Sequence, residues 1–267
     1  YIMKPSHVEA INNADLIFFV SDEHLETFLS KPLSNVNNNA KIVELMDNED
    51  LFVLKFREKN IYLGDDHDDH DEHDDHDDHD EHDDQDEHDG HDEHAHGEFD
   101  IHIWLDPFNA KVIANNIAEE LSKLDPANTS TYQNNRDKFV EKVSDTEEKI
   151  SQQLDHYVSY VTFHDAYQYF ENRFDVASSG ALTINPDVMP GARQLSDVRE
   201  LMADNDIHCI FSEPQFNPKV VEVIAEDTNT KMGILDPLGA TIPLGKDHYL
   251  GVLTDIADSL EDCGHDH

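Results

Sequence analysis

A long, uninterrupted helical pattern between Asn128 and Tyr157 constrains the fold of this chain more than any other feature. Asn128, Thr129 and Ser130 are natural N-caps, and neither Pro nor Gly occurs before Val158. About 25 residues at 1.5 Å each make a rod of roughly 37 Å, which can join two lobes stiffly. The apolar stripe recurs at intervals of three, four or seven residues and comprises Tyr132, Phe139, Val143, Thr146, Ile150, Leu154 and Tyr157.

The helical pattern leads into a short apolar strand that ends near His164. Residues 160–163 favour a strand because they are β-branched or aromatic, and Asp165 can cap the helix that follows. His164 is therefore expected at a strand-to-helix corner, which is where ligands bind in open α/β sheets. Taken alone, a histidine at such a corner is more often structural than a ligand.

Size and charge limit the classes of function. A chain of 267 residues can bury one large core or two modest ones, and the rod favours two. The formal net charge of -42 repels phosphate backbones and anionic lipid, so we expect no nucleic-acid partner, whereas cations are attracted. The longest apolar stretch, residues 16–20, is too short for direct membrane insertion. The start at Tyr1 and the lack of a signal peptide are expected of a processed chain.

Residues 65–96 form a low-complexity segment with 19 acidic residues, ten histidines and neither Lys nor Arg. Because Ala95 is its only apolar side chain, we expect it to be disordered without a ligand. Imidazoles suit zinc, copper and nickel ions, which predicts a weak, multi-ion accessory metal site; the alternative is an acidic solubilising linker. The histidines are His67, His70, His73, His76, His79, His82, His88, His91, His94 and His96.

The first part of the chain predicts a compact α/β unit. We expect helices at 5–13 and 22–30 and strands at 15–20 and 41–45.

After the acidic segment, residues 99–105 alternate in polarity, which predicts a strand with His102 and Trp104 on one face and apolar residues on the other. Pro107 then begins a helix that runs to about Leu124. His102 thus lies near a second strand-to-helix boundary.

Beyond the rod, strands and helices alternate. We expect strands at 158–163, near Val176, at 207–212 and at 231–235, with helices at 166–173, 192–204, 218–227 and 248–262. This order predicts a four-strand, mostly parallel sheet whose strand-end loops share one edge. Those loops carry His164, Glu213 and Asp236, although an Asp before Pro is more often a turn former.

The two cysteines leave two interpretations open. Cys209 lies in an apolar strand pattern, and Cys263 closes the last helix. Two separate thiols are usual in a cytosolic chain. In an oxidising compartment a disulfide between them would stabilise the fold by roughly 4 kcal/mol on the chain-entropy model. Their spacing alone does not decide between the two.

Several short motifs, taken in order, resemble the zinc-specific periplasmic solute-binding proteins of bacterial ABC importers. The resemblance covers nearly the whole chain. It rests on YIMKPS at 1–6, NADL at 13–16, HIWLDP at 102–107, FHDAY at 163–167, EPQF at 213–216 and DPLG at 236–239.

The resemblance implies two α/β lobes with mostly parallel sheets, joined by one rigid helix, with the metal in the cleft between them. The N-terminal lobe would span 1–126 with the His/Asp-rich loop 65–96, the linking helix 127–157, and the C-terminal lobe 158–267. It further implies a disulfide between Cys209 and Cys263 and a periplasmic location.

The same resemblance implies that three histidines hold the zinc ion, often with a carboxylate or water as the fourth ligand. His102 and His164 match two of the three, and Asp236 is a further candidate. Members with Glu in place of His164 tend to bind manganese, so His164 favours zinc. The family's remaining histidine lies in a Pro-His-x-Tyr motif whose Tyr corresponds to Tyr1. That ligand and its strand therefore lie upstream of this sequence, or a loop histidine or Asp236 takes its place.

We therefore expect high-affinity capture of Zn²⁺ by a monomer and delivery to an ABC permease in the inner membrane, without catalysis. One alternative is a zinc hydrolase in which His102, His164 and Asp236 hold the metal and Glu213 or Asp165 is the general base. Another is a periplasmic zinc buffer without a transporter partner. The sequence has neither a nucleophile motif nor an HExxH pair, so catalysis is the weaker hypothesis.

Overall fold

The structure is a computed structural model, and it describes residues 2–22, 25–36, 40–62, 99–154, 158–186 and 188–264. The predicted accessory metal segment 65–96 lies outside the described residues, as do Tyr1 and Tyr157.

The N-terminal elements follow the predicted order with one exception. Strands β1 and β2 pair in parallel, with Leu16 opposite Lys41, and this confirms the strands expected at 15–20 and 41–45. The elements are α1 (Pro5–Asn12), β1 (Leu16–Phe19), the 3₁₀ helix η1 (Thr27–Leu29), α2 (Ser30–Ser34), β2 (Lys41–Glu44) and the 3₁₀ helix η2 (Leu45–Asp47).

The helix predicted at 22–30 is wrong. The carboxylate of Glu26 accepts hydrogen bonds from the backbone nitrogens of Val20 and Ser21, at 2.8 and 3.0 Å. These bonds hold Glu26 against the end of β1, and among the described residues of 22–30 helical backbone begins at Thr27. The spacing of apolar residues does not reveal these side-chain-to-backbone hydrogen bonds, because the glutamate occupies a position that would also suit a helix surface.

The strand predicted at 99–105 is also wrong, since residues Ile103–Leu105 form the 3₁₀ helix η3. Asp100 accepts a hydrogen bond from the backbone nitrogen of His102 at 2.9 Å, and this two-residue turn bends the chain. The predicted apolar face is nevertheless buried. Helix α3 (Pro107–Leu124) follows with the predicted bounds, capped by the Asp106 side chain.

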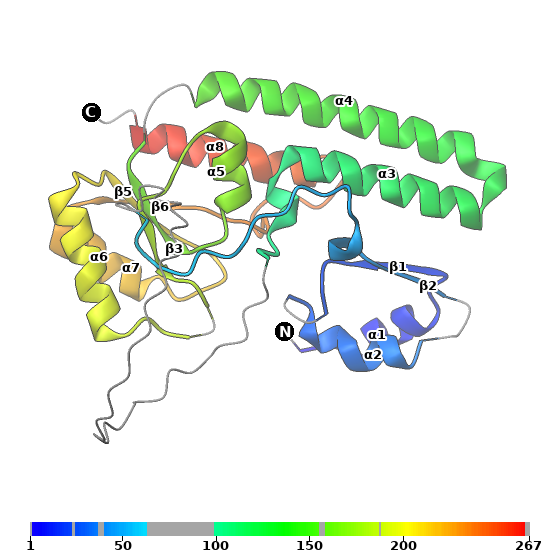
Figure 1. Ribbon diagram of the computed structural model, residues 1–267, viewed down its shortest axis with the longest axis horizontal. Coiled ribbons are helices and arrows are strands. Elements are labelled where there is room, and N and C mark those ends of the chain that lie inside the picture. Colours follow the sequence, from blue (N-terminus) through cyan, green and yellow to red (C-terminus); the bar gives the residue numbers. More distant parts are fainter. Residues whose placement is uncertain are drawn as a thin grey trace, which may run out of the picture.

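The predicted rod is one helix, α4 (Thr129–Gln153), preceded by the 3₁₀ turn η4 (Pro126–Asn128). It ends at Gln153, four residues before the expected end at Tyr157. The Leu154 nitrogen donates the last hydrogen bond of the helix to the Ile150 carbonyl. Figure 1 shows α4 lying along α3 and above α8, and its buried stripe includes Val143 and Ile150.

The C-terminal half contains the predicted four-strand sheet, and all three of its strand pairs are parallel, in the order β4-β3-β5-β6. Its elements are β3 (Tyr160–His164), α5 (Gln168–Phe174), β4 (Gly180–Thr183), α6 (Ala192–Asp204), β5 (Cys209–Ser212), α7 (Lys219–Thr228), β6 (Lys231–Ile234) and α8 (His248–Gly264). The helix predicted at 192–204 has the expected bounds, and the helices expected at 218–227 and 248–262 are shifted or extended by one or two residues.

The strand predicted near Val176 is wrong by four residues. Asp175 ends α5 in the left-handed conformation, with φ of 53°, and the Val176 nitrogen bonds to the carbonyl of Glu171. Val176 is therefore part of a helix terminus whose side chain fills the core, and the strand begins at Gly180.

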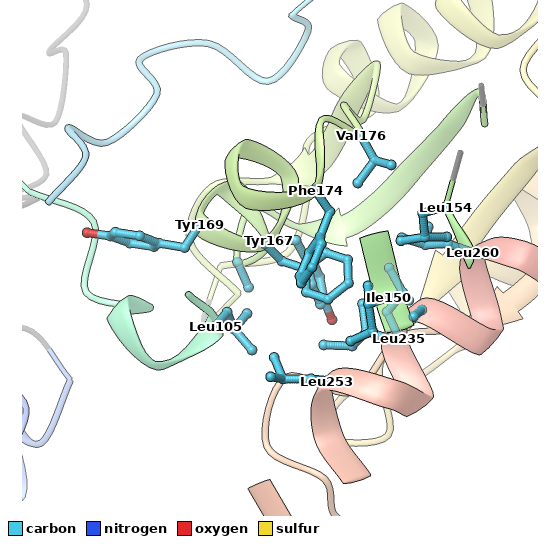
Figure 2. Packing of buried hydrophobic residues seen from close by; sticks show 14 of the residues in the cluster. Leu105, Ile150, Leu154, Tyr167, Tyr169, Phe174, Val176, Leu235, Leu253 and Leu260 are labelled. Carbon is cyan, nitrogen blue, oxygen red and sulfur yellow. The ribbon is translucent and has the colours of Figure 1, made fainter. Parts of the chain in front are cut away.

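Among the described residues, two apolar clusters cover the two faces of this sheet. Tyr160 and Phe211 contribute to the cluster beneath α5 and α8, whereas Val161 and Ile210 face α6 and α7. The first cluster draws residues from all three predicted regions. Figure 2 shows its members packed together, among them Leu105, Ile150, Leu235 and Leu253.

A disulfide joins Cys209 on β5 to Cys263 on α8, with their Cα atoms 6.0 Å apart. The pairing implied by the resemblance is therefore confirmed. Both cysteines are buried, and the bond attaches the last helix to the sheet.

Candidate metal centre

Two imidazoles from distant parts of the chain meet in the interior. His102 directly precedes η3, His164 ends β3, and their Nε2 atoms are 3.3 Å apart. The ring centroids are separated by 5.2 Å, and the two residues are only 9% and 6% exposed. The resemblance implied that both histidines hold one ion, and the structure places them beside each other, although His102 lies on a turn and not on a strand.

A carboxylate holds the other nitrogen of each ring. The Nδ1 atom of His102 lies 2.6 Å from Asp100, and the Nδ1 atom of His164 lies 2.7 Å from Glu213. Such contacts place the proton on Nδ1 and leave the lone pair on Nε2. In the neutral rings, Nε2 is therefore the nitrogen that can bind a metal ion, and the two Nε2 atoms face one another.

The spacing of the two Nε2 atoms suits a tetrahedral zinc ion. Zn–N bonds of about 2.0–2.1 Å at the tetrahedral angle separate two ligand nitrogens by about 3.3–3.4 Å. The distance between the His102 and His164 nitrogens is 3.3 Å. The distance between the two nitrogens therefore fits two ligands of one tetrahedral ion.

Electrostatics at His102 favour positive charge. Burial opposes the charged imidazole, but the adjacent Asp100 carboxylate outweighs it and raises the pKa of His102. Burial likewise opposes the charged Asp100, yet His102 keeps the pKa of Asp100 below its usual range. The Asp100 carboxylate thus supplies a fixed negative charge beside this nitrogen ligand.

Asp236, the third predicted ligand, is engaged elsewhere. Its carboxylate accepts hydrogen bonds from the backbone nitrogens of residues 238–240, at 2.5 to 3.1 Å, and from the Gln215 amide at 2.6 Å. In the part of the chain that the structure describes, no three His, Cys, Asp or Glu side chains gather as a metal-binding group. The structure brings His102 and His164 together and does not add Asp236 to them.

The two carboxylates expected as general base in the hydrolase alternative both have other partners. Glu213 holds His164, and Asp165 forms an ion pair with Arg57 at 2.8 Å. Each retains one buried oxygen without a hydrogen-bond partner in the structure, Glu213 Oε2 and Asp165 Oδ2. One oxygen of each carboxylate is thus committed to a neighbouring side chain, Glu213 to His164 and Asp165 to Arg57.

Sequence reasoning missed Asp100 and Arg57. A sequence signal existed for Asp100, because an aspartate two residues before a histidine can form the observed turn. Arg57 carried no comparable signal, since its partners Asp165 and Glu171 follow it by more than a hundred residues.

Aromatic side chains wall the pair. The Trp104 ring lies 5.4 Å from that of His102, and its indole nitrogen donates to the Pro237 carbonyl at 2.8 Å. The Phe216 ring lies 6.1 Å from that of His164. Apolar walls lower the local dielectric and strengthen the attraction between the carboxylates and a bound cation.

A parallel α/β sheet, a long helix that packs along α3 and α8, and a buried imidazole pair with carboxylate partners place the chain among the metal-binding solute-binding proteins. The family model described as "Zinc-uptake complex component A periplasmic" matches residues 1–263. The chain belongs to this zinc-uptake family.

Curated relatives agree with this assignment. The High-affinity zinc uptake system protein ZnuA of Brucella abortus (strain 2308) is 41% identical over 270 residues, covering 98% of this chain and 80% of the relative. The protein of the same name from Yersinia pestis is 36% identical, and the match covers 98% of this chain and 80% of the relative.

Solved structures share the fold. A crystal structure of ZnuA aligns with a TM-score of 0.72 at 22% identity, covering 98% of this chain and 85% of that one. The laminin-binding adhesin Lmb of Streptococcus agalactiae, in a mutant structure, aligns with a TM-score of 0.73 at 25% identity, covering 98% and 86%. Within the described ranges, no helix combines the length and the apolar character needed to cross a membrane.

Proposed function

We propose that this chain is the zinc-capturing receptor of an ABC-type importer, which binds Zn²⁺ as cargo and delivers it to a membrane permease. The observation that supports it best is the 3.3 Å between the Nε2 atoms of His102 and His164. Two nitrogens on one tetrahedral zinc ion have this spacing. The role is binding and release, not catalysis.

Support for the cellular setting comes from the relatives. The matching family is described as a periplasmic component of a zinc-uptake complex, and the relatives from Brucella and Yersinia are named as zinc uptake proteins. We propose a periplasmic location, an inner-membrane permease as partner, and a monomeric receptor. The division into lobes 1–126 and 158–267 joined by helix 127–157 is part of this proposal.

The proposed ligand set contains His102 and His164. The other positions around the ion remain predictions: a histidine upstream of Tyr1, a histidine of segment 65–96, water, or Asp236. To bind the metal, Asp236 would first have to give up hydrogen bonds that its carboxylate accepts from the backbone of residues 238–240.

Zinc is expected to bind more tightly than manganese. Imidazole nitrogens suit the borderline-soft zinc ion, whereas manganese prefers oxygen ligands and lies lower in the Irving–Williams order. Competition titrations with a chromophoric chelator, on protein prepared without a metal-affinity step and lacking residues 65–96, measure both ions. Manganese binding as tight as zinc binding would contradict the two-histidine site.

Excising residues 65–96 should leave the fold and the tight site intact. The segment has one apolar side chain, so neither core loses packing, and ligands fixed by packing lose little entropy on binding. Calorimetry of the full chain should resolve one strong event and several weaker ones, and the shortened chain should keep only the strong one. Loss of the strong event would mean that a loop histidine completes the site, and it would favour the zinc-buffer alternative.

A further inference from the structure

Residues 54–57, here called the strap, contact Asp100, which holds His102, and Asp165, which directly follows His164. Figure 1 shows the strap within the blue-to-cyan chain that crosses from the N-terminal elements to the four-strand sheet. Beyond it, Ile61 forms an antiparallel bridge with Gly180 on β4, and the Asn60 carbonyl accepts a hydrogen bond from Ala181 at 2.8 Å. The strap is thereby attached to the sheet that carries His164.

On the His102 side, the strap bonds directly to the backbone of Asp100, and Gln168 connects the strap to the Asp100 carboxylate. The Asp100 nitrogen donates to the Leu54 carbonyl at 2.8 Å. The Gln168 amide donates to the Lys55 carbonyl at 3.0 Å and to Asp100 Oδ2 at 3.1 Å. Gln168 thus links the strap, the first turn of α5 and the carboxylate that orients His102.

Tyr169 reinforces this arrangement from the neighbouring position. Its hydroxyl donates to the Asp100 carbonyl at 2.6 Å and accepts from the Leu54 nitrogen at 3.1 Å. In Figure 2 the Tyr169 hydroxyl points away from the apolar cluster. The backbone around Asp100 is therefore fixed from two directions.

On the His164 side, Arg57 holds the corner that follows the strand. Its guanidinium donates to Asp165, the residue after His164, at 2.8 Å and to Glu171 of α5 at 2.6 Å. It also lies 4.2 Å from the centre of the Tyr62 ring. Both carboxylates are almost fully buried, so their positions depend on this cation.

We infer that Arg57 and Gln168 are positioning residues that set the spacing of the two imidazoles before the metal binds. Contacts run from Asp100 through Gln168 to the strap, and Arg57 of the strap contacts Asp165. The turn that carries His102 and the strand end that carries His164 are therefore both positioned by the same short segment. Ligands that are already held in position lose little conformational freedom when the metal binds, and this raises the affinity for zinc. This inference rests on the proposed function.

The test compares Arg57→Met and Gln168→Leu with the parent chain and with Arg136→Met, all lacking residues 65–96. Arg136 is a matched control because its side chain is 28% exposed, against 23% for Arg57, and it links Asn115 of α3 to α4 away from the histidines. Zinc affinity is measured by chelator competition, ligand geometry by the Co²⁺ absorption spectrum, and stability by thermal unfolding.

We expect Arg57→Met and Gln168→Leu each to weaken zinc binding by about 10- to 100-fold, as loss of residues behind metal ligands typically does. Their Co²⁺ spectra should differ from that of the parent, and Arg57→Lys should recover part of the affinity. Arg136→Met should retain the parent affinity and spectrum even where its unfolding temperature falls. Gln168 is partly exposed and uncharged, so Gln168→Leu tests the inference even if Arg57→Met does not fold.

Two results would overturn the inference. In the first, Gln168→Leu and Arg57→Met keep the parent's affinity and Co²⁺ spectrum while His164→Ala loses zinc binding; the metal site then stands and the strap's role fails. In the second, Arg136→Met loses as much affinity as the strap variants, so the loss follows general destabilisation. If His164→Ala keeps the parent affinity, the proposed site and this inference fail together.

Discussion

Replacing His102 and His164 together by alanine is expected to abolish tight zinc binding. Protein zinc sites of four ligands bind with about 10–16 kcal/mol, or roughly 3 kcal/mol for each ligand. Each histidine is thus worth on the order of a hundredfold in affinity, and the pair on the order of 10⁴-fold. Alanine also leaves the Asp100 and Glu213 carboxylates buried without their imidazole partners.

The measurement is a chelator competition titration on protein lacking residues 65–96, so that loop histidines do not contribute. His208→Gln is the matched control. His208 directly precedes β5, at the opposite end of the sheet from His164, and its imidazole lies 3.8 Å from Asp206. The control should bind zinc as the parent does. A double variant that binds as tightly as the parent would rule out the proposed site.

Elements whose signals are local could be predicted from the sequence. Helix α3 starts at Pro107 behind the Asp106 cap and has a continuous apolar stripe, so both its ends were predicted. The parallel sheet followed from the strict alternation of strands and helices after the rod. The meeting of His102 and His164 was implied by the family resemblance, because the sequence pattern placed each histidine at a strand-to-helix corner without relating the two corners.

Two of the failures share a physical cause, which is hydrogen bonding of the backbone by one polar side chain. Glu26 bonds to the end of β1 where a helix was expected, and Asp100 bends the chain where a strand was expected. In both places the apolar pattern predicted the wrong type of secondary structure. For residues 99–105 it nevertheless identified the buried side chains correctly. A hydrogen bond of this kind depends on a single side chain, so no periodic pattern records it.

The partners of the two imidazoles were harder to predict for a different reason. Glu213 follows His164 by 49 residues, and their contact depends on β3 and β5 being neighbours in the sheet. Strand order is not encoded in any one strand, because all four are short. The same holds for Arg57, whose partners can be identified only once the strap is placed against α5.

Removing the disulfide is expected to have the second large effect, this time on stability. Cys209 and Cys263 are separated by 54 residues, and closing a loop of this length in the unfolded chain stabilises the native state by roughly 4 kcal/mol on the chain-entropy model. For a chain of this size, that corresponds to a fall in the unfolding temperature of about 8–16 °C. The change is Cys209→Ala together with Cys263→Ala, since a buried serine hydroxyl would add its own cost.

Urea unfolding followed by circular dichroism measures the loss, and thiol titration of the unfolded, unreduced parent should find no reactive thiol. Zinc affinity should not change, because Cys209 begins β5 beside Tyr160, whereas His164 lies at the other end of β3. The expectation fails if the double variant unfolds at the parent's urea concentration, or if titration finds two reactive thiols. A stability loss with unchanged zinc affinity would show that the bond fixes α8 to the sheet independently of the metal centre.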